Sequence, residues 1–233
     1  MINKILRIIN ILEVIVIILL LSFGTTKIVE WNKESKETKE VINDIKNYTE
    51  DNKIKNLKVK NKDTIGILKV NNTNIDYPFL QAKDNNYYLT HNFNKKKTSA
   101  GWIFLDKRNN KDLNDKNNII YGHSRKDKSM FGTLKNTLSK EWYMNKNNRN
   151  IKILTETRTY NYEIFSIYKI EKENYYLQTE FKTDKEYKNF LNIIKDRSIY
   201  NFDINIENIT SILTLSTCYK NDRRVVVHAK LID

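Results

Sequence analysis

The chain has 233 residues and a net charge of +13, from 41 Lys and Arg against 28 Asp and Glu. Only 8 of the basic residues are Arg and the lysines are spread along the whole chain, which argues against a clustered nucleic-acid-binding face. The single cysteine excludes an internal disulfide, and one Cys with three scattered His shows no metal-ligand spacing.

The N-terminal segment predicts a membrane anchor. Lys4 and Arg7 precede an apolar stretch from Ile8 to Phe23 that is interrupted chiefly by Glu13. This stretch is short for a spanning helix, so a cleaved signal peptide is the alternative, but residues 22–27 show no clear small-x-small cleavage site. We expect an uncleaved signal anchor over residues 1–26, with the N-terminus inside the cell and the rest of the chain outside.

Residues 27–63 are highly charged and contain no Pro or Gly. Val41, Ile42, Ile45 and Tyr48 recur there at helical spacing. We expect one or two amphipathic helices that link the anchor to a folded domain or pack on its outside.

From Thr64 onward the apolar pattern changes to short or alternating runs separated by polar connections. Such a series predicts a closed barrel or a sandwich, and a chain of this length can bury a full core as one domain over residues 64–233. The predicted strands are Ile65 to Val70, Ile75 to Leu80, Trp102 to Leu105, Asn118 to Tyr121, Ile151 to Thr155, Thr159 to Ile170, Ser211 to Thr217 and Arg224 to Ile232.

One segment, Asp184 to Arg197, departs from the strand pattern. Its apolar residues Tyr187, Phe190, Leu191 and Ile194 fall at i, i+3, i+4 and i+7, with charges on the other face. This spacing predicts an amphipathic helix inserted before the last two strands.

Cys218 ends the apolar run that begins at Ser211, six residues before Arg224. A thiol becomes a nucleophile as the thiolate, which a nearby imidazole or guanidinium favours. A turn over residues 219–223 would bring Cys218 and Arg224 to adjacent ends of neighbouring antiparallel strands. On spacing alone, a lone Cys that serves as a small buried hydrophobe stays open as the alternative.

Among the histidines, His123 has the setting of a functional residue, because an apolar strand ends in Tyr121-Gly122 and delivers it into a loop. His228 alternates with valines in a predicted strand, so we expect it to face solvent or to fill a polar niche. The pattern around His91 assigns it no role.

Three segments together resemble the signature segments of the sortases, the cysteine transpeptidases of Gram-positive cell surfaces. They are Ile119-Ile-Tyr-Gly-His123, Thr214-Leu-Ser-Thr-Cys218 and Arg224-Val-Val-Val-His-Ala-Lys-Leu231, in the family's order of His, Cys and Arg. Further stretches resemble class B sortases in particular: Asn74-Ile-Asp-Tyr-Pro78, Asp84-Asn-Asn-Tyr-Tyr-Leu89, Ala100-Gly-Trp-Ile-Phe-Leu-Asp106 and Ser129-Met-Phe-Gly-Thr-Leu134. The resemblance extends from about Thr64 to the C-terminus.

The resemblance implies a mainly β fold: an eight-stranded sortase-type β-barrel with N-terminal helices and a helix inserted before the last two strands. It implies that Cys218 attacks the Thr carbonyl of a sorting motif to form a thioester. His123 would protonate the leaving amine and deprotonate the incoming one. Arg224 would hold the substrate carbonyl or its oxyanion.

The resemblance also places Asn85, Leu89 and Ser216 at positions that line the substrate groove. A one-residue slip in the last strand would exchange the faces of Arg223 and Arg224, and the following valines favour Arg224 as the inward residue. Asp106 is expected to have a structural role rather than that of a third catalytic residue. No acidic cluster suggests calcium, so we expect no metal and no cofactor.

The implied partners are secreted proteins with a C-terminal sorting motif of the Asn-Pro-x-Thr or Leu-Pro-x-Thr-Gly type. The acceptor would be an amine of a peptidoglycan precursor or of another surface protein, such as a pilin. Alternatives are a membrane-anchored cysteine peptidase that hydrolyses its substrate, a non-catalytic peptide-binding barrel and a basic nucleic-acid-binding domain. Papain-like hydrolases generally place Cys before His, whereas here His123 precedes Cys218.

Overall fold

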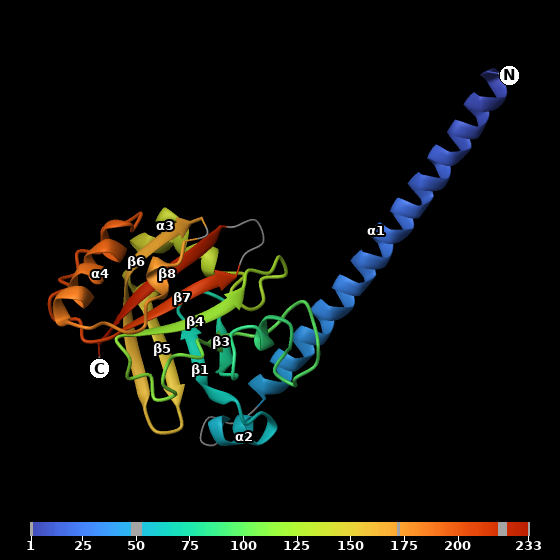
Figure 1. The fold of residues 1–233 in the computed structure, drawn as a ribbon. Helices are drawn as coiled ribbons and strands as arrows, with labels where there is room; N and C mark the ends of the chain where they lie inside the picture. The colour runs from blue at the N-terminus through green and yellow to red at the C-terminus, as the bar shows by residue number, and fades with distance from the viewer. Residues whose placement is uncertain (1, 48–52, 172, 219–222, 233) are drawn as a thin grey trace.

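A computed structural model describes residues 2–47, 53–171, 173–218 and 223–232 (Figure 1). The long helix α1 (Ile2–Lys46) projects from the rest of the molecule, and the short helix α2 (Lys53–Lys60) follows it. The most apolar 18-residue window of α1 has a mean hydropathy of 2.6 and none of it is buried. This N-terminal helix therefore fits a single-pass membrane anchor. It continues without a break past residue 26.

In the described part of the chain, eight strands close into a barrel in the order β1-β2-β3-β4-β7-β8-β6-β5, which confirms the predicted fold. Every predicted strand range agrees with the structure to within two residues at each end. The strands are β1 (Thr64–Val70), β2 (Asp76–Leu80), β3 (Phe104–Leu105), β4 (Asn117–His123), β5 (Asn150–Thr155), β6 (Thr159–Ile170), β7 (Ile212–Cys218) and β8 (Arg224–Leu231).

The strand β3 is shorter than the predicted run from Trp102 to Leu105. The backbone N–H of Trp102 donates to the carbonyl of Tyr88, outside the sheet, and its indole Nε1–H donates to the Pro78 carbonyl at 2.7 Å. Trp102 is 1% exposed, so its apolar signal reflects burial of the ring rather than membership of the sheet.

The predicted helix before the last two strands is present as α4 (Asp184–Asp196). Its four predicted apolar residues are all buried, and Thr183 caps the helix by accepting a hydrogen bond from the Glu186 N–H. The short elements were not predicted because they do not complete enough turns to show a helical period: η2 (Tyr87–Leu89), η3 (Leu134–Leu138), α3 (Lys140–Met144), η4 (Lys146–Arg149) and η5 (Tyr175–Leu177).

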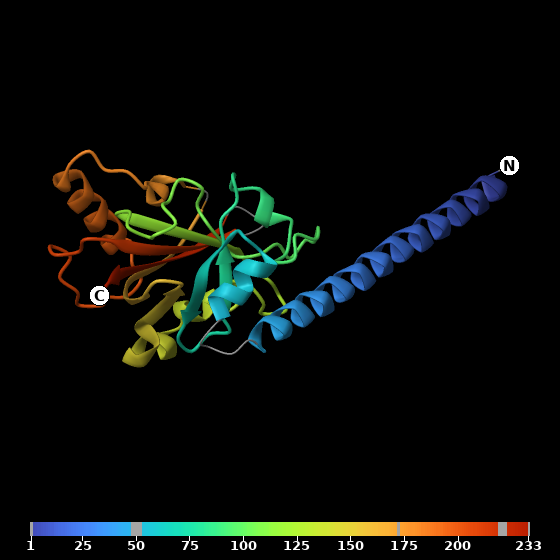
Figure 2. The same ribbon diagram turned by 90° about the horizontal axis from the view of Figure 1, so that it is seen from below.

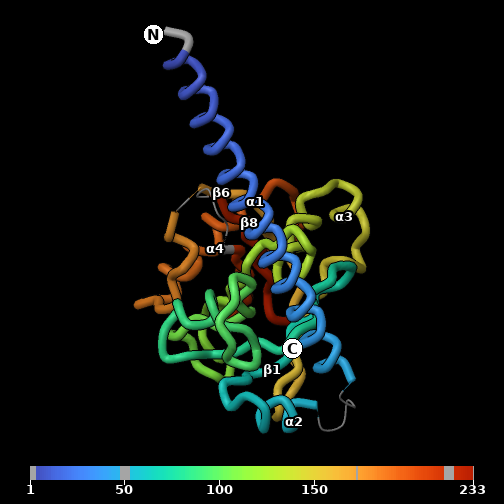
Figure 3. Tube along the Cα trace, turned by 90° about the vertical axis from the view of Figure 1, so that its right-hand side faces the viewer, coloured from blue at the N-terminus to red at the C-terminus, as the bar shows by residue number. Residues whose placement is uncertain are grey.

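The C-terminal part of α1 lies against one side of the barrel (Figures 2 and 3). Ile42 and Ile45 are 8% and 4% exposed and belong to the hydrophobic core, and Ser35 and Thr38 on the same face are also buried. From Lys4 to Lys33, by contrast, the residues of α1 are exposed except for the half-buried Gly24. One helix thus combines a bare apolar segment with a segment docked on the barrel.

Candidate active site

The catalytic candidates meet at the end of the parallel pair formed by β4 and β7. In this ladder His123, the last residue of β4, pairs with Cys218, the last residue of β7. Neighbouring strands lie about 5 Å apart, so the two backbones are adjacent. The side chain of Cys218 lies outside the described part of the chain, and its thiol is not located.

His123 is half-buried, and its Nε2 lies 2.8 Å from the backbone carbonyl oxygen of Leu89. A carbonyl oxygen only accepts hydrogen bonds, so Nε2 carries a proton and Nδ1 is the ring nitrogen that can exchange one. Gly101 packs against this contact, and its backbone has a positive φ of +57°. A Cβ at Gly101 would lie 2.8 Å from the Leu89 oxygen and 3.0 Å from His123 Cδ2, so glycine permits the close approach.

Arg224 begins β8, which pairs antiparallel with β7 as predicted. Its Nη1 donates a hydrogen bond to the Tyr176 hydroxyl at 3.0 Å, and the same hydroxyl lies 3.0 Å from Ser216 Oγ. The side chain of Arg223 is 72% exposed, 3.9 Å from Glu171. Of the two arginines, Arg224 is therefore the one tied to the barrel interior.

A groove of about 550 Å³ lies beside these residues. Its described lining comes from the segment after β4, from β6 and from the facing ends of β7 and β8: Ser124, Lys135, Lys169, Thr217, Arg223, Arg224 and Val225. The lining is basic, since it holds two lysines and two arginines and no acidic residue among its described members. A groove of this size can hold several residues of an extended peptide.

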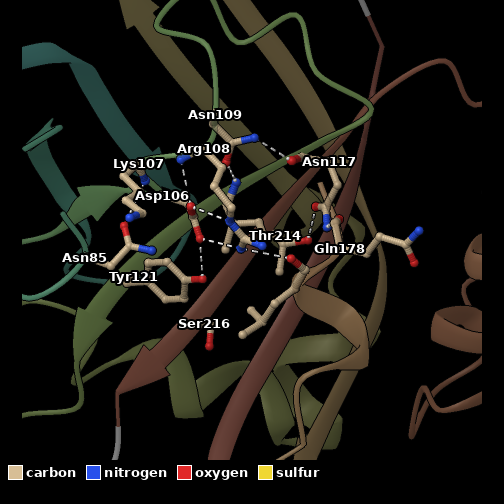
Figure 4. Close-up of polar contacts among 12 residues, drawn as sticks. Asn85, Asp106, Lys107, Arg108, Asn109, Asn117, Tyr121, Gln178, Thr214 and Ser216 are labelled. Carbon is tan, nitrogen blue, oxygen red and sulfur yellow. Dashed lines mark hydrogen bonds and ion pairs between the residues drawn. The ribbon is translucent and has the colours of Figure 1, made fainter. Parts of the chain in front are cut away.

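The three predicted substrate-binding residues lie in different settings. Leu89 provides the carbonyl that holds His123, and Ser216 is 0% exposed behind the Tyr176 hydroxyl. Asn85 lies on the loop before η2, where its Oδ1 accepts a hydrogen bond from the Lys107 backbone N–H at 2.8 Å (Figure 4). The structure thus joins Leu89 to His123 directly, and Ser216 to Arg224 through Tyr176.

Asp106 forms a closed ion-pair cluster (Figure 4). Its fully buried carboxylate accepts hydrogen bonds from Arg108 Nε at 2.9 Å and Nη2 at 2.7 Å, and from the Tyr121 hydroxyl at 2.8 Å. Burial opposes its ionisation, but the bonds from Arg108 and Tyr121 outweigh burial and lower the pKa of Asp106 to about 2. These contacts fit the structural role expected from the sequence.

His228 fills a polar niche rather than facing solvent. It is 0% exposed, with Nε2 2.8 Å from the Tyr168 hydroxyl and Nδ1 2.9 Å from Thr214 Oγ1. Thr214 donates its hydroxyl proton to Asn117 Oδ1 (Figure 4), so it accepts from His228 Nδ1–H and Tyr168 donates to Nε2. Burial lowers the pKa of His228 to about 3, which keeps the imidazole neutral at physiological pH.

Two parts of this site carry no signal that the sequence reveals. Tyr176 lies in the polar connection between β6 and α4, where an aromatic residue has no periodic context. The Leu89 carbonyl is a backbone group, which residue type does not report. Of the residues around His123, the sequence could have marked Gly101 as a position of close backbone approach, because the chain has just five glycines.

The comparisons with known proteins agree with this geometry. The family model for the sortase domain matches residues 68–232. Sortase B of Listeria monocytogenes is 36% identical over 216 residues, which is 85% of this chain and 87% of that protein. The crystal structure of Staphylococcus aureus sortase B has a TM-score of 0.73 and 31% identity, covering 88% of this chain and 98% of that one. Clostridium perfringens sortase B has a TM-score of 0.70 and 36% identity, covering 77% and 99%.

The matched domain takes in β4, β7 and β8, the strands that bring His123, Cys218 and Arg224 to one end of the barrel. Identity and coverage of this extent, together with the shared barrel, identify the relationship. The chain belongs to the sortase family of cysteine transpeptidases, in its class B group.

Proposed function

We propose that this chain cleaves a C-terminal sorting motif after Thr through a thioester on Cys218 and transfers the new acyl end to an amine. The motif is of the Asn-Pro-x-Thr or Leu-Pro-x-Thr-Gly type. The register that pairs His123 with Cys218 at the end of β4 and β7 carries this proposal, because it brings an acid–base group beside the only thiol of the chain.

In the first half-reaction the Cys218 thiolate attacks the Thr carbonyl carbon, and the carbonyl oxygen takes up the negative charge. Arg224 stabilises that oxyanion, since its guanidinium stays charged and presents several donors, one of which Tyr176 holds. The carbon–nitrogen bond then breaks. His123 delivers a proton from Nδ1 to the leaving amine, and the acyl group stays on sulfur.

In the second half-reaction the acceptor amine attacks the thioester carbonyl, and His123 removes its proton through Nδ1. The carbon–sulfur bond breaks and the Cys218 thiolate returns. Throughout, the Leu89 carbonyl holds Nε2–H, so the imidazole keeps one orientation while Nδ1 exchanges the proton.

The substrates in this proposal are secreted proteins that carry the motif, and the acceptor is an amine of a peptidoglycan precursor or of another surface protein. Residues 1–26 anchor the enzyme with its N-terminus inside, residues 27–63 form the juxtamembrane link and residues 64–233 are the catalytic domain. Asn85, Leu89 and Ser216 are the proposed groove residues: Asn85 and Leu89 are half-buried, and the buried Ser216 acts through the Tyr176 hydroxyl.

Intact-mass analysis tests the proposed chemistry. The full chain in detergent micelles is mixed with peptides carrying either motif, in the presence and absence of an amine acceptor. We expect a mass gain equal to the peptide fragment that ends at Thr, seen with the native chain and lost in Cys218→Ala. A retained adduct in Cys218→Ala would refute the thioester, and release of free acid even with the acceptor present would indicate a hydrolase.

Replacement of Arg224 tests the oxyanion role. We expect Arg224→Ala to lower kcat/KM by the equivalent of about 3 to 4 kcal/mol, the usual loss for an oxyanion donor. Arg224→Lys should also be poor, because an ammonium group lacks the planar fork of guanidinium. Tyr176→Phe removes one hydrogen bond to Arg224 and should cost about 1 kcal/mol. Initial rates of acylation measure all three.

The neighbouring arginine supplies the matched control. Arg223→Ala removes the same group one position earlier, from a side chain that is 72% exposed, and should leave kcat/KM nearly unchanged. If Arg223→Ala is the damaging variant and Arg224→Ala is not, the two arginines exchange roles.

A further inference from the structure

The contacts that α1 makes nearest its apolar segment hold two loops beside His123. The first loop is residues 90–103, between η2 and β3, and the second is residues 124–133, between β4 and η3. Glu34 accepts hydrogen bonds from the backbone N–H and the hydroxyl of Ser99, two residues before Gly101. One residue further along the helix, Ser35 Oγ accepts from Arg125 Nη2 at 2.9 Å and donates to Asp127 Oδ2 at 2.8 Å.

These contacts show which end of the barrel faces the apolar segment of α1. Deeper along α1, Ile42 lines a cavity with the β1–β2 turn and with residues 127–129, and Asp44 pairs with Lys60 of α2. On the apolar side of Glu34, side chains are exposed back to Lys4 apart from Gly24. The His123 end is therefore the end nearest the apolar segment, and the arrowheads of β4 and β7 point to that side in Figure 1.

The helix also fixes the height of this end above the bilayer. Lys27 follows the proposed anchor, and the exposed Ile28, Val29 and Trp31 suit the interfacial layer, where aromatic residues gather. An α-helix rises 1.5 Å per residue, so Glu34 lies about 12 Å beyond residue 26. The headgroup layer is about 5 to 8 Å thick, which leaves only about 5 Å between the headgroups and the loops that α1 holds.

The charges on these loops are sorted by direction. Two acids are engaged: Glu34 of α1 bonds to Ser99 of the first loop, and the buried Asp127 of the second loop pairs with Arg125. Lys95 pairs with Asp63 at 2.9 Å. The remaining lysines of the two loops are exposed: Lys96, Lys97, Lys126 and Lys128. The exposed acids Glu37 and Glu40 lie on α1 one to two turns farther from the membrane and line a pocket with Lys96.

We propose that the four exposed lysines of these loops form a docking surface for anionic phospholipid headgroups and hold the catalytic end of the barrel against the bilayer. This inference rests on the proposed membrane anchor. Lysine ammonium groups near an anionic surface are attracted to it, each by about fivefold in binding, and α1 keeps the surface within their reach. A substrate would then enter the site in the plane just above the headgroups.

Fluorescence quenching in vesicles tests the docking. A Cys218→Ala background frees a single introduced thiol for a dye, placed at Lys126→Cys or, as the matched control, at Lys116→Cys. Lys116 is exposed and precedes β4, at the opposite end of the strand from His123. The full chain is reconstituted into phosphatidylglycerol vesicles that contain nitroxide-labelled headgroups. Flotation of the chain together with the vesicles is measured first, to show that the chain is inserted.

We expect the dye at residue 126 to be quenched more strongly than the dye at residue 116. Replacing the other three lysines by Gln, or adding 1 M salt, should remove most of the difference, because salt screens charges beyond about 3 Å. Equal quenching at both positions would overturn the docking and leave the anchor and the chemistry standing. A chain that does not float with the vesicles would overturn the anchor and the docking together.

Two further variants separate geometry from charge. Inserting about two helical turns after Trp31 raises the barrel by about 10 Å with little rotation, so it should lose the quenching at residue 126. With Cys218 intact, replacing all four lysines by Gln should leave acylation by a soluble peptide in detergent unchanged. A loss of activity there would assign the lysines to the active site itself and overturn the docking.

Discussion

Replacing His123 by Ala should lower turnover by about 10²- to 10⁴-fold, the range that general acid–base catalysis contributes. The reason is geometric: the Leu89 carbonyl holds Nε2–H at 2.8 Å, so in the proposed mechanism Nδ1 carries out the proton transfer beside the end of β7. Product formation from a motif peptide and an amine, followed by mass spectrometry, gives the rate.

His91→Ala is the matched control for this prediction. His91 is a half-buried histidine of the adjoining loop, with Nδ1 bonded to the Tyr87 carbonyl and its ring stacked on Tyr87. It should retain nearly full turnover. Added imidazole should restore part of the activity of His123→Ala, which would not happen if the variant had merely lost its fold. Full turnover in His123→Ala would remove it from the mechanism.

The barrel could be predicted because its strands have strong local patterns. β6 and β8 carry long apolar or alternating runs, and α4 shows a clear helical period. The order of the strands around the barrel did not follow from those patterns. It depends on pairings such as β4 with β7, which join residues nearly 100 positions apart and which no local pattern reports.

The proposed chemical groups could be named from the sequence, but not the contacts that position them. Tyr176 lies between Arg224 and Ser216. An aromatic residue in a polar connection does not predict such a contact from its residue type alone. The Leu89 carbonyl orients His123 through a backbone atom. Such contacts arise when loops meet in the folded state, and single-sequence patterns do not encode them.

The contact between Ser35, Arg125 and Asp127 is of the same kind. All three belong to segments rich in charged residues, which predicts solvent exposure. The Arg125 and Asp127 side chains are nevertheless only 7% and 6% exposed. The helix α1 completes this cluster, since Ser35 bonds to both charged partners. A buried ion pair of this kind makes the stability of the barrel sensitive to either charge.

Asp127→Ala should therefore lower the free energy of unfolding by about 3 to 5 kcal/mol, because it leaves the Arg125 guanidinium buried without its counter-charge. Urea unfolding of the full chain in detergent, followed by tryptophan fluorescence, measures the loss. Glu156→Ala is the control: it breaks the ion pair with Lys58, whose side chains are 41% and 40% exposed, and should leave stability nearly unchanged.

The pH dependence gives the same cluster an independent test. Burial opposes ionisation of Asp127, but hydrogen bonds from Arg125, Ser129 and Ser35 outweigh it and hold the pKa of that carboxyl well below its usual range. A lowered folded-state pKa stabilises the fold above the ordinary Asp value of about 3.9, and this contribution is lost as pH falls below it. The difference in free energy of unfolding between the native chain and Asp127→Asn should therefore be largest near neutral pH and should decrease in acid. A gap that stays constant down to low pH would mean that the Asp127 charge does not stabilise the loop after His123.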